Sequence, residues 1–470
     1  MTRIPTLIAT LLLGASAMAS HGETANRPNI LFISIDDLRN DLGVFGVEWA
    51  KTPHLDGFAA TARPFSHHYV HAPTCGASRY NLLSGMRPTK PIHVRNDSIR
   101  QTSSEWAQRS LPGIFKNAGY HTLALGKIGH YPGGLTGKNW NAPPEEIAGV
   151  WDRHWIPDGP WEHAQSIMHG YANGVPRTPG QSPAIEAFDG PDEAYPDAWV
   201  AKDAVETLAE LAESEKPWLF AVGFFKPHLP FAAPRRYFDM HEGNVPDLAP
   251  EVAAKPTWPS GWHNSGEFRR NYGHPGGRDP ATHPEYAREL REAYAATVTY
   301  VDVQVGRVLD ALEKSGLAEN TIVVIWSDHG FLLGEHAIWG KHCLYEHSLR
   351  CPLIIRHPGI AEAGAMSDAI VETVDILPTL ADLAGIPAPD GLHGHSLRPQ
   401  LENPAQPAAK PALGFWSGGQ RTIREARWRL IVDGNGGRAE LFDYQTDPHE
   451  TRNHADDHPD VVRRLGEKLK

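Results

Sequence analysis

Asn29-Ile-Leu-Phe-Ile-Ser-Ile-Asp-Asp37 is a continuous apolar run that ends in two adjacent carboxylates. A short apolar run without alternation predicts a strand that is buried on both faces. Four later runs have the same character: 121–125, 218–222, 321–326 and 352–355. Between them, apolar residues at intervals of three and four predict helices over 200–211 and 294–312. Short buried strands that alternate with longer helices predict an α/β fold with a mainly parallel sheet.

The length and composition bound the architecture. With 470 residues the chain is too long for one simple core, so we expect two structural units. We place a larger unit at residues 27–365 and a smaller C-terminal α+β unit at 366–470. Hydrophobic residues make up 41% and charged residues 21% of the chain, which is typical of a soluble globular protein. The formal net charge of −12 argues against a nucleic-acid-binding surface and a polybasic membrane patch.

The N-terminus has the pattern of a secretory signal peptide. Arg3 gives a positive start, residues 7–15 form an apolar core, and Ala17-Met-Ala19 is a small-residue cleavage site. The apolar core is too short to span a bilayer, and no Cys follows the cleavage site to carry a lipid, so we expect no membrane anchor. We therefore predict a signal peptide over residues 1–19 and secretion, with a bacterial periplasm as the compartment.

Polar clusters follow four of the predicted strands at their carboxyl ends. They are Asp36-Asp37, Lys127 with His130, Lys226-Pro-His228, and Asp328-His329. Open α/β sheets bind ligands at this edge, so the coincidence indicates an enzyme. Asp36, Asp37 and Asp328 could supply three carboxylates to one hard cation such as Ca²⁺ or Mg²⁺. The adjacent pair alone could equally cap a turn, but the third carboxylate favours a metal site.

A thirteen-residue run follows the first of these clusters: Cys75-Gly-Ala-Ser-Arg-Tyr-Asn-Leu-Leu-Ser-Gly-Met-Arg87. A small residue at a helix N-terminus lies where backbone N–H groups and the helix dipole favour anions. Arg79, one turn on, shares a face with Cys75 and can donate two hydrogen bonds to a tetrahedral oxyanion. The alternative is a buried structural Cys beside a surface Arg, since free Cys is commonly a small core residue.

The order of these motifs resembles the type I sulfatase family from about Asn29 to the Asp447-Pro-His-Glu450 segment. The run from Cys75 is similar to the family signature, Cys-x-Pro/Ala-x-Arg with a Leu-Thr/Ser-Gly-x-Arg tail. Residues 222–231 and 328–341 most resemble the iduronate-2-sulfatase group. In the second of these stretches an Asp-His pair stands where many sulfatases have Asp-Asn, and the same pair also occurs in phosphonate monoester hydrolases. The resemblance implies an alkaline-phosphatase-like fold whose larger unit is catalytic.

The resemblance also implies a modified nucleophile and a metal ion. In the family a maturase oxidises the signature Cys to formylglycine, whose hydrated aldehyde attacks sulfur, so Cys75 would be the precursor of the nucleophile. The third signature position is Ala77, where Pro is common, and maturases differ in which residue they accept. Ca²⁺ would act as Lewis acid and template, held by residue 75 together with Asp36, Asp37, Asp328 and His329.

The other motif residues would manage charge and protons. The resemblance implies that three cations neutralise the sulfate and the charge that develops during transfer: Arg79, Lys127 and Lys341. His228 would protonate the departing sugar oxygen, and His130 would accept the proton whose loss from the second hydrate hydroxyl releases sulfate. Five further histidines could support the site or contact the substrate, and we assign them no role: His67, His68, His71, His336 and His342.

Two long segments and two cysteines leave alternatives open. Residues 132–196 and 242–284 are rich in Gly and Pro, and loops of this length are either binding loops or insertions without function. Cys343 and Cys351 could pair in an oxidising compartment, but two unpaired buried thiols are the simpler interpretation.

These observations predict a secreted, Ca²⁺-dependent sulfatase that acts on a sulfated carbohydrate. The resemblance favours 2-O-sulfate on a uronic acid of a glycosaminoglycan or related polysaccharide, and it implies a maturase as a protein partner. A phosphonate or phosphate ester hydrolase on the same fold is an alternative enzyme class. A glycan-binding pseudo-enzyme whose Cys75 is never oxidised is a non-catalytic alternative. The sequence does not determine the linkage cleaved, exo or endo action, or the oligomeric state.

Overall fold

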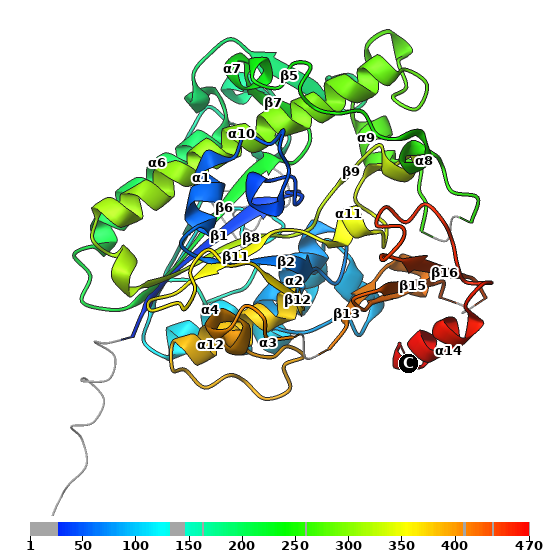
Figure 1. The fold of residues 1–470 in the computed structure, drawn as a ribbon. Coiled ribbons are helices and arrows are strands. Elements are labelled where there is room, and N and C mark those ends of the chain that lie inside the picture. Colours follow the sequence, from blue (N-terminus) through cyan, green and yellow to red (C-terminus); the bar gives the residue numbers. More distant parts are fainter. Residues whose placement is uncertain are drawn as a thin grey trace, which may run out of the picture.

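An eight-stranded sheet runs through the centre of the protein (Figure 1). The computed structural model describes residues 27–131, 146–161, 164–258, 261–407, 410–434 and 437–469. The strand order is β12-β2-β11-β8-β1-β6-β3-β4. In that order the strands span Ser367–Glu372, Arg63–Tyr69, Leu353–Arg356, Thr321–Ser327, Asn29–Asp36, Trp218–Pro227, His121–Gly126 and Arg153–Trp155.

The sheet is mainly parallel, as the sequence predicts. β1 pairs in parallel with β6 and β8, β3 with β6 and β4, and β12 with β2. The five strands predicted from apolar runs are confirmed, although the last of them, β11, is antiparallel to both its neighbours. β2, β4 and β12 lie toward the two ends of the strand order. Their sequences mix polar and apolar residues, so no continuous apolar run marks them.

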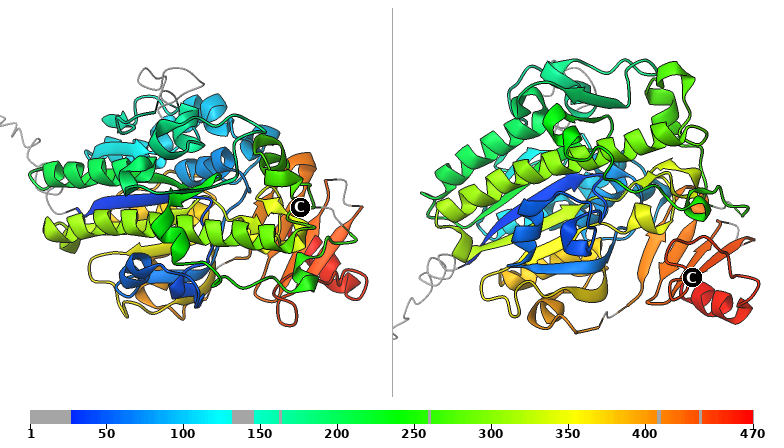
Figure 2. Two further views of the ribbon diagram at one scale, coloured as in Figure 1. Left: turned by 90° about the horizontal axis from the view of Figure 1, so that it is seen from above. Right: turned by 45° about the horizontal axis from the view of Figure 1, so that its top comes forward.

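Helices cover both faces of the sheet (Figures 1 and 2). One face packs against α1 (Pro53–Ala59), α6 (Pro196–Leu211) and α10 (Pro284–Lys314). The other face packs against α2 (Cys75–Ser84), α3 (Ser98–Trp106), α4 (Leu111–Asn117) and α12 (Ile376–Leu383). The two helices predicted from periodicity are therefore confirmed as α6 and α10. Because both faces are covered, every residue of β1 is buried.

A second, antiparallel sheet lies at the C-terminal end of the chain (Figure 1). It consists of β13 (Ala412–Phe415), β14 (Arg421–Arg424), β15 (Trp428–Val432) and β16 (Ala439–Asp443), and α14 (Pro459–Lys468) packs against it. The domain boundary after residue 365 stays a prediction, and β12, which follows it directly, pairs with β2 of the large sheet.

The two long segments contain short elements. The first includes α5 (Ala164–Met168) and β5 (Ile185–Phe188), and β5 pairs with β7 (Phe231–Pro234). The second includes α8 (Pro250–Ala253) and α9 (Gly266–Asn271). The predicted signal peptide lies outside the described residues. Within the described ranges, we find no helix with the length and apolar character needed to cross a membrane.

Candidate active site

The carboxyl ends of the central strands bring the predicted metal ligands together. β1 and β8 run in register, with Ile35 opposite Ser327, so the residues that follow each strand also meet. The Asp37 backbone N–H donates to Asp328 Oδ1 at 3.1 Å. Asp37 has a φ of 61°, in the left-handed region, and this turns the chain out of β1 directly after Asp36. The turn lets two consecutive carboxylates reach one buried site.

Helix α2 begins at Cys75 and presents that residue to the same edge of the sheet. Asn96 fixes the start of the helix, because its Oδ1 accepts from the Gly76 N–H at 3.0 Å and from Thr74 Oγ1 at 3.1 Å. Cys75 Sγ lies 3.4 Å from His329 Nε2 and 3.6 Å from Lys341 Nζ. Burial, and then the neighbouring carboxylates, raise the pKa of the Cys75 thiol well above its ordinary value. The unmodified side chain is therefore a protonated thiol.

The donor atoms of four buried residues form a group that fits a metal ion. These atoms lie within 4.8 Å of one another and come from Asp36, Cys75, Asp328 and His329. His329 Nδ1 donates to the Gly330 carbonyl at 3.0 Å, which leaves Nε2 as the ring atom that faces the group. Asp37 belongs to a second, overlapping group with His228. Each group contains two carboxylates, and the two groups together contain three, which suits a hard cation such as Ca²⁺.

Three buried cations surround these carboxylates. Arg79 donates through Nε to Asp328 at 2.9 Å and through Nη2 to Asp36 at 3.3 Å, and Lys127 Nζ forms an ion pair with Asp36. Lys341 Nζ donates to both oxygens of Asp37, at 2.9 and 3.0 Å. Burial alone would raise the pKa of Asp36, but Lys127, His228 and Arg79 outweigh it and hold the pKa well below its ordinary value.

The guanidinium of Arg79 is fully engaged by the protein. Besides the two carboxylates it donates to Ser34 Oγ at 3.0 Å, and to the carbonyls of Lys127 and Ile128. Arg79 is completely buried. In this geometry its direct effect is to position the carboxylates of the metal group, and its predicted contact with sulfate stays a prediction.

His228 and His130 flank the group from two different loops. His228 Nδ1 donates to the Leu229 carbonyl at 2.7 Å, so its Nε2 is the atom that faces Glu267 Oε1, at 3.5 Å. Burial, followed by the charge of Lys341, lowers the pKa of His228. Burial, followed by the charge of Lys127, holds the pKa of His130 well below its ordinary value. His130 Nδ1 has no hydrogen-bond partner among the described residues.

Glu267 is a site residue that the sequence did not reveal. It lies in α9, within the second long segment, and its Oε2 is 3.7 Å from Lys341 Nζ. Burial alone would raise the pKa of Glu267, but Lys341 and His228 hold it well below the ordinary value, so the carboxylate is ionised. The sequence indicated only that this segment could be a binding loop. A single Glu in a Gly-rich segment belongs to no motif with a recognisable spacing, so Glu267 itself was not predicted.

Several candidates prove to be structural. Lys226 Nζ donates to the carbonyls of His228 and Pro230, at 3.1 and 2.6 Å, and so holds the His228 loop. Four of the five unassigned histidines bond or stack within the protein: His67, His68, His71 and His336. His342 also stacks within the protein, on Trp416, and it lines the cleft. Cys343 and Cys351 are both buried as free thiols.

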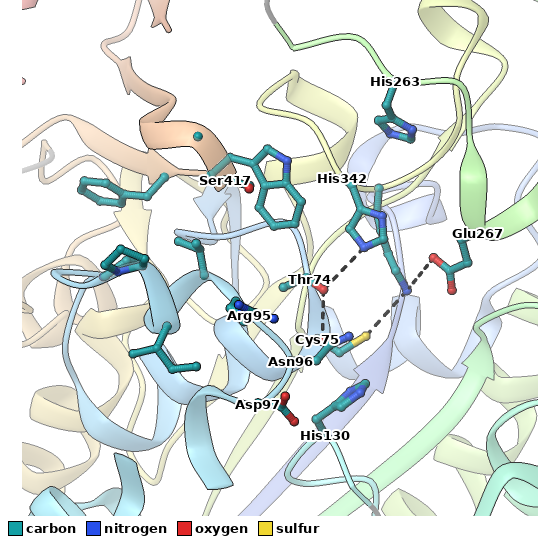
Figure 3. Close-up of a pocket in the computed structure, with 18 of the residues that line it drawn as sticks. Thr74, Cys75, Arg95, Asn96, Asp97, His130, His263, Glu267, His342 and Ser417 are labelled. Atoms are coloured by element: carbon teal, nitrogen blue, oxygen red, sulfur yellow. Dashed lines mark hydrogen bonds and ion pairs between the residues drawn. The ribbon is translucent and has the colours of Figure 1, made fainter. Parts of the chain in front are cut away.

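The site opens into a cleft of about 2150 Å³. Its lining includes residues from the segment 88–97, which leads from α2 to α3, and from the turn at 415–421 of the C-terminal sheet. Figure 3 shows Cys75 at the base of this cleft, with His130 and Glu267 on either side of it. The cleft is large enough for an oligosaccharide.

Comparisons with known proteins agree with this geometry. A family model described as Sulfatase matches residues 28–386, and one described as N-sulphoglucosamine sulphohydrolase, C-terminal, matches residues 334–470. Iduronate 2-sulfatase of Mus musculus is 29% identical over 428 residues, which cover 82% of this chain and 73% of that protein. A sulfatase of Formosa agariphila is 29% identical over 456 residues, which cover 92% of this chain and 83% of that protein.

The solved structures show the same fold. Phosphonate monoester hydrolase of Agrobacterium radiobacter matches with a TM-score of 0.76 at 24% identity, covering 94% of this chain and 95% of that one. This likeness confirms the predicted alkaline-phosphatase-like architecture.

Proposed function

Because the chain belongs to the sulfatase family, we propose that it hydrolyses carbohydrate sulfate esters with a formylglycine made from Cys75. Hydrolysis of sulfate esters follows from the family. The observation that carries the finer proposal is the position of Cys75, which begins α2 and lies among the buried donor atoms of Asp36, Asp328 and His329. A residue so placed can be a nucleophile and a metal ligand at the same time.

A bound Ca²⁺ would supply positive charge and orientation for a sulfate oxygen. Asp36, Asp37, Asp328 and His329 would hold it together with residue 75. The charges of the described site support this assignment. Four carboxylates, those of the three aspartates and of Glu267, face three cations, so the protein alone gives a sulfate ester little net attraction. A divalent ion would make the site positive.

The chain's own residues would then handle charge and protons. Lys127 and Lys341, both buried at the site, would stabilise charge on the sulfate oxygens during transfer. His228 Nε2 would donate a proton to the departing sugar oxygen, and the ionised Glu267 beside it opposes the burial and the Lys341 charge that lower the pKa of the imidazole. His130, whose Nδ1 lacks a partner among the described residues, would accept the proton that accompanies sulfate release.

The proposed substrate is 2-O-sulfate on a uronic acid of a glycosaminoglycan or related polysaccharide. The name of the mouse relative, iduronate 2-sulfatase, supports this choice. A cleft that is lined by several Lys and Arg side chains, in a chain of net charge −12, also favours a polyanionic ligand. Secretion to a periplasm is part of the proposal and rests on the sequence of residues 1–19.

Mass spectrometry of the tryptic peptide that carries residue 75 tests the proposal on protein from its native host. Conversion of the thiol to an aldehyde lowers the mass by about 18 Da, and we expect the loss in active protein. Because Ala77 replaces the common Pro, co-expression with different maturases should change the converted fraction and the activity in parallel. An intact thiol in fully active protein would refute the formylglycine mechanism.

Phosphonate or phosphate ester hydrolysis is a second candidate. The fold match to a phosphonate monoester hydrolase is the observation that favours it. Sulfate monoesters carry one negative charge and phosphate monoesters carry two, so a matched pair of aryl esters distinguishes the candidates. We expect a higher kcat/KM for the sulfate.

A further inference from the structure

Arg95 is a cation in the cleft that neither the fold nor the proposed reaction uses. Its side chain is exposed and makes no hydrogen bond or ion pair with the described residues. The other lysines and arginines that line the cleft each have a partner: Lys90 with Glu105, Arg270 with the Gly266 carbonyl, Lys341 with Asp37, and Arg421 with the Leu469 carbonyl. Arg95 is therefore the cleft arginine that is free to bind a ligand.

The backbone around Arg95 is fixed against the helix of the nucleophile. The neighbouring Asn96 accepts from the Gly76 N–H, and Ser98 Oγ donates to the Gly76 carbonyl at 2.9 Å. The two segments also touch through their backbones, since a Cβ on Gly76 would lie 2.1 Å from the Asn96 carbonyl oxygen. In Figure 3, Arg95 lies in the cleft between Ser417 and Asp97, on the same side of the cleft as Thr74. The backbone that carries Arg95 is thus held against the helix that begins at Cys75.

An aromatic ring lines the cleft beside this segment. Trp416 is half-buried and stacks on His342, with ring centroids 5.4 Å apart and an angle of 9° between the planes. His342 directly follows Lys341, so the stack links Trp416 to the reacting centre. The backbone N–H of Trp416 donates to the Gln420 carbonyl at 2.9 Å, and this bond closes the turn that carries the indole ring.

This turn lies against the segment that carries Arg95. The short helices η12 (Ser417–Gly419) and η3 (Pro91–Val94) are in contact. Gly434 packs on the turn from behind, since a Cβ there would lie 1.8 Å from the Gly418 carbonyl oxygen. The Trp416 ring and the Arg95 side chain are therefore carried by two loops that contact each other, and each loop is packed against another part of the protein.

We propose that Arg95 and Trp416 form a second sugar-binding subsite, here called the outer subsite. An arginine binds a carboxylate or sulfate through two parallel hydrogen bonds, and an aromatic face packs against a sugar ring. The outer subsite would bind an anionic group other than the sulfate that is cleaved, and so select glycans with at least two anionic groups. The inference rests on the proposed function, because it takes a sulfated glycan as the substrate.

A set of three probes tests the outer subsite. The first is a disaccharide of unsaturated 2-O-sulfated uronic acid linked to glucosamine 6-sulfate. The second has the uronic acid carboxylate reduced to an alcohol, and the third lacks the 6-sulfate. We expect the wild type to lose about 10- to 100-fold in kcat/KM on the probe that lacks the recognised group, the size of one lost hydrogen bond to a charged group. The affected probe identifies the carboxylate or the 6-sulfate as the ligand.

The variant Arg95→Gln should show the same loss on the intact disaccharide, mostly in KM, and should no longer respond to removal of that group. The matched control is Arg463→Gln, which removes the same charge from an exposed arginine on α14, outside the cleft. It should discriminate among the probes as the wild type does.

Trp416→Ala should raise KM on the intact disaccharide, and Trp416→Phe should recover most of the loss.

Two outcomes would overturn the outer subsite. If the wild type releases sulfate from all three probes equally well, the outer subsite is refuted and the proposed function stands. If Arg95→Gln still discriminates among the probes as the wild type does, the recognised group is bound elsewhere. Absence of sulfate release from every probe, by protein with a verified formylglycine, would refute the proposed function and the outer subsite together.

Discussion

The imidazole of His228 is oriented for proton donation by two contacts. Its Nδ1 is committed to the Leu229 carbonyl, and its Nε2 faces Glu267. His228→Ala should therefore lower the rate on a sugar sulfate, whose alkoxide leaves poorly, by about 10²- to 10⁴-fold. An activated aryl sulfate needs no protonation and should lose far less. Steady-state kinetics on both substrates measure the difference, and equal losses would contradict the role of leaving-group acid.

Glu267 should act through His228. Its carboxylate is 3.5 Å from the imidazole and does not enter the metal groups formed by the described residues. Glu267→Gln should lower the rate on a sugar sulfate in the wild type but add little to His228→Ala, with a coupling free energy of about 1–3 kcal/mol. In the pH–rate profile of the single variant, the limb that reports the protonated acid should move to lower pH, because Glu267 raises the pKa of His228. Additive losses in the double variant would show that Glu267 acts independently, for example through Lys341.

Metal binding should be visible as stability. Asp36, Asp37 and Asp328 are buried together, and a divalent cation relieves their mutual repulsion. Saturating Ca²⁺ should stabilise the protein by about 2.7 kcal/mol at a hundred times Kd, and a chelator should reverse the shift. Calorimetry with and without Ca²⁺ measures this, and Asp328→Asn should abolish most of it. A larger shift with Mg²⁺ would overturn the assignment of Ca²⁺.

At the scale of elements, the approach of β6 to β3 places Lys127. A Cβ on Gly223 would lie 2.1 Å from the Lys127 carbonyl oxygen, and the Lys127 N–H donates to the Gly223 carbonyl at 3.0 Å. Gly223→Ala should push the β3 end outward, cost about 1–3 kcal/mol of folding free energy, and lower activity further by moving Lys127 away from Asp36. Denaturant unfolding and kinetics check both effects.

The matched control is Gly466→Ala in α14. A Cβ there meets nothing within 4 Å, so the change should raise stability by up to about 1 kcal/mol through helix propensity and leave activity alone. Wild-type activity in Gly223→Ala would show that the strand end tolerates the shift.

Elements differ in how well the sequence predicts them. β1 and β8 are continuous apolar runs because both faces of the sheet are covered, and parallel strands in register carry Asp36 and Asp328 to one edge. These features are local in the sequence, so the carboxylates of the candidate metal site could be predicted from the sequence alone. Glu267 reaches the site because of the way a long segment folds in three dimensions. The sequence of that segment has no periodicity from which this course could be predicted.

The same holds for β2, whose mixed sequence Arg63-Pro-Phe-Ser-His-His-Tyr69 has no continuous apolar run. The turn at Trp416 is a comparable case, because only the packing of the second sheet brings it over the cleft. The roles of Lys226 and His71 could not be foreseen either, since their partners are the backbone carbonyls of Pro230, in a loop, and of Leu413, far along the chain.

At the scale of the whole molecule, a buried charge cluster joins the C-terminal sheet to the large one. Glu346, in α11 (Glu346–Leu349), forms an ion pair with Arg429 of β15 and accepts from Tyr69 of β2 at 2.9 Å. Glu450, from the segment that marked the end of the family resemblance, pairs with the same Arg429 at 2.9 Å. The cluster ties β2, α11 and the second sheet together, so the wall of the cleft that carries Trp416 depends on it.

The charges of this cluster predict how the stability of the folded protein falls at acid pH. Burial alone would raise the pKa of Glu346, but Arg429 and Arg424 hold it well below its ordinary value. Likewise Arg39, opposing burial, lowers the pKa of Glu335 to about 2. For both groups the folded-state pKa is below the unfolded value of about 4.3, so the folded state binds fewer protons near that pH. Their stabilisation is complete at higher pH and is lost as the pH falls through and below 4.3.

Glu346→Gln should therefore cost about 3–5 kcal/mol at pH 7, because it leaves Arg429 buried with one carboxylate partner fewer. Between pH 5 and pH 3 the same variant should lose less stability than the wild type. It no longer has the Glu346 carboxylate, whose protonation destabilises the folded wild type in this range. Urea unfolding across this range measures both effects, and Glu215→Gln, at an exposed glutamate, is the control. A variant whose stability runs parallel to that of the wild type at every pH would show that the pKa of Glu346 is the same in the folded and unfolded protein, and the ion pairs of Glu346 would then contribute nothing to the loss of stability in acid.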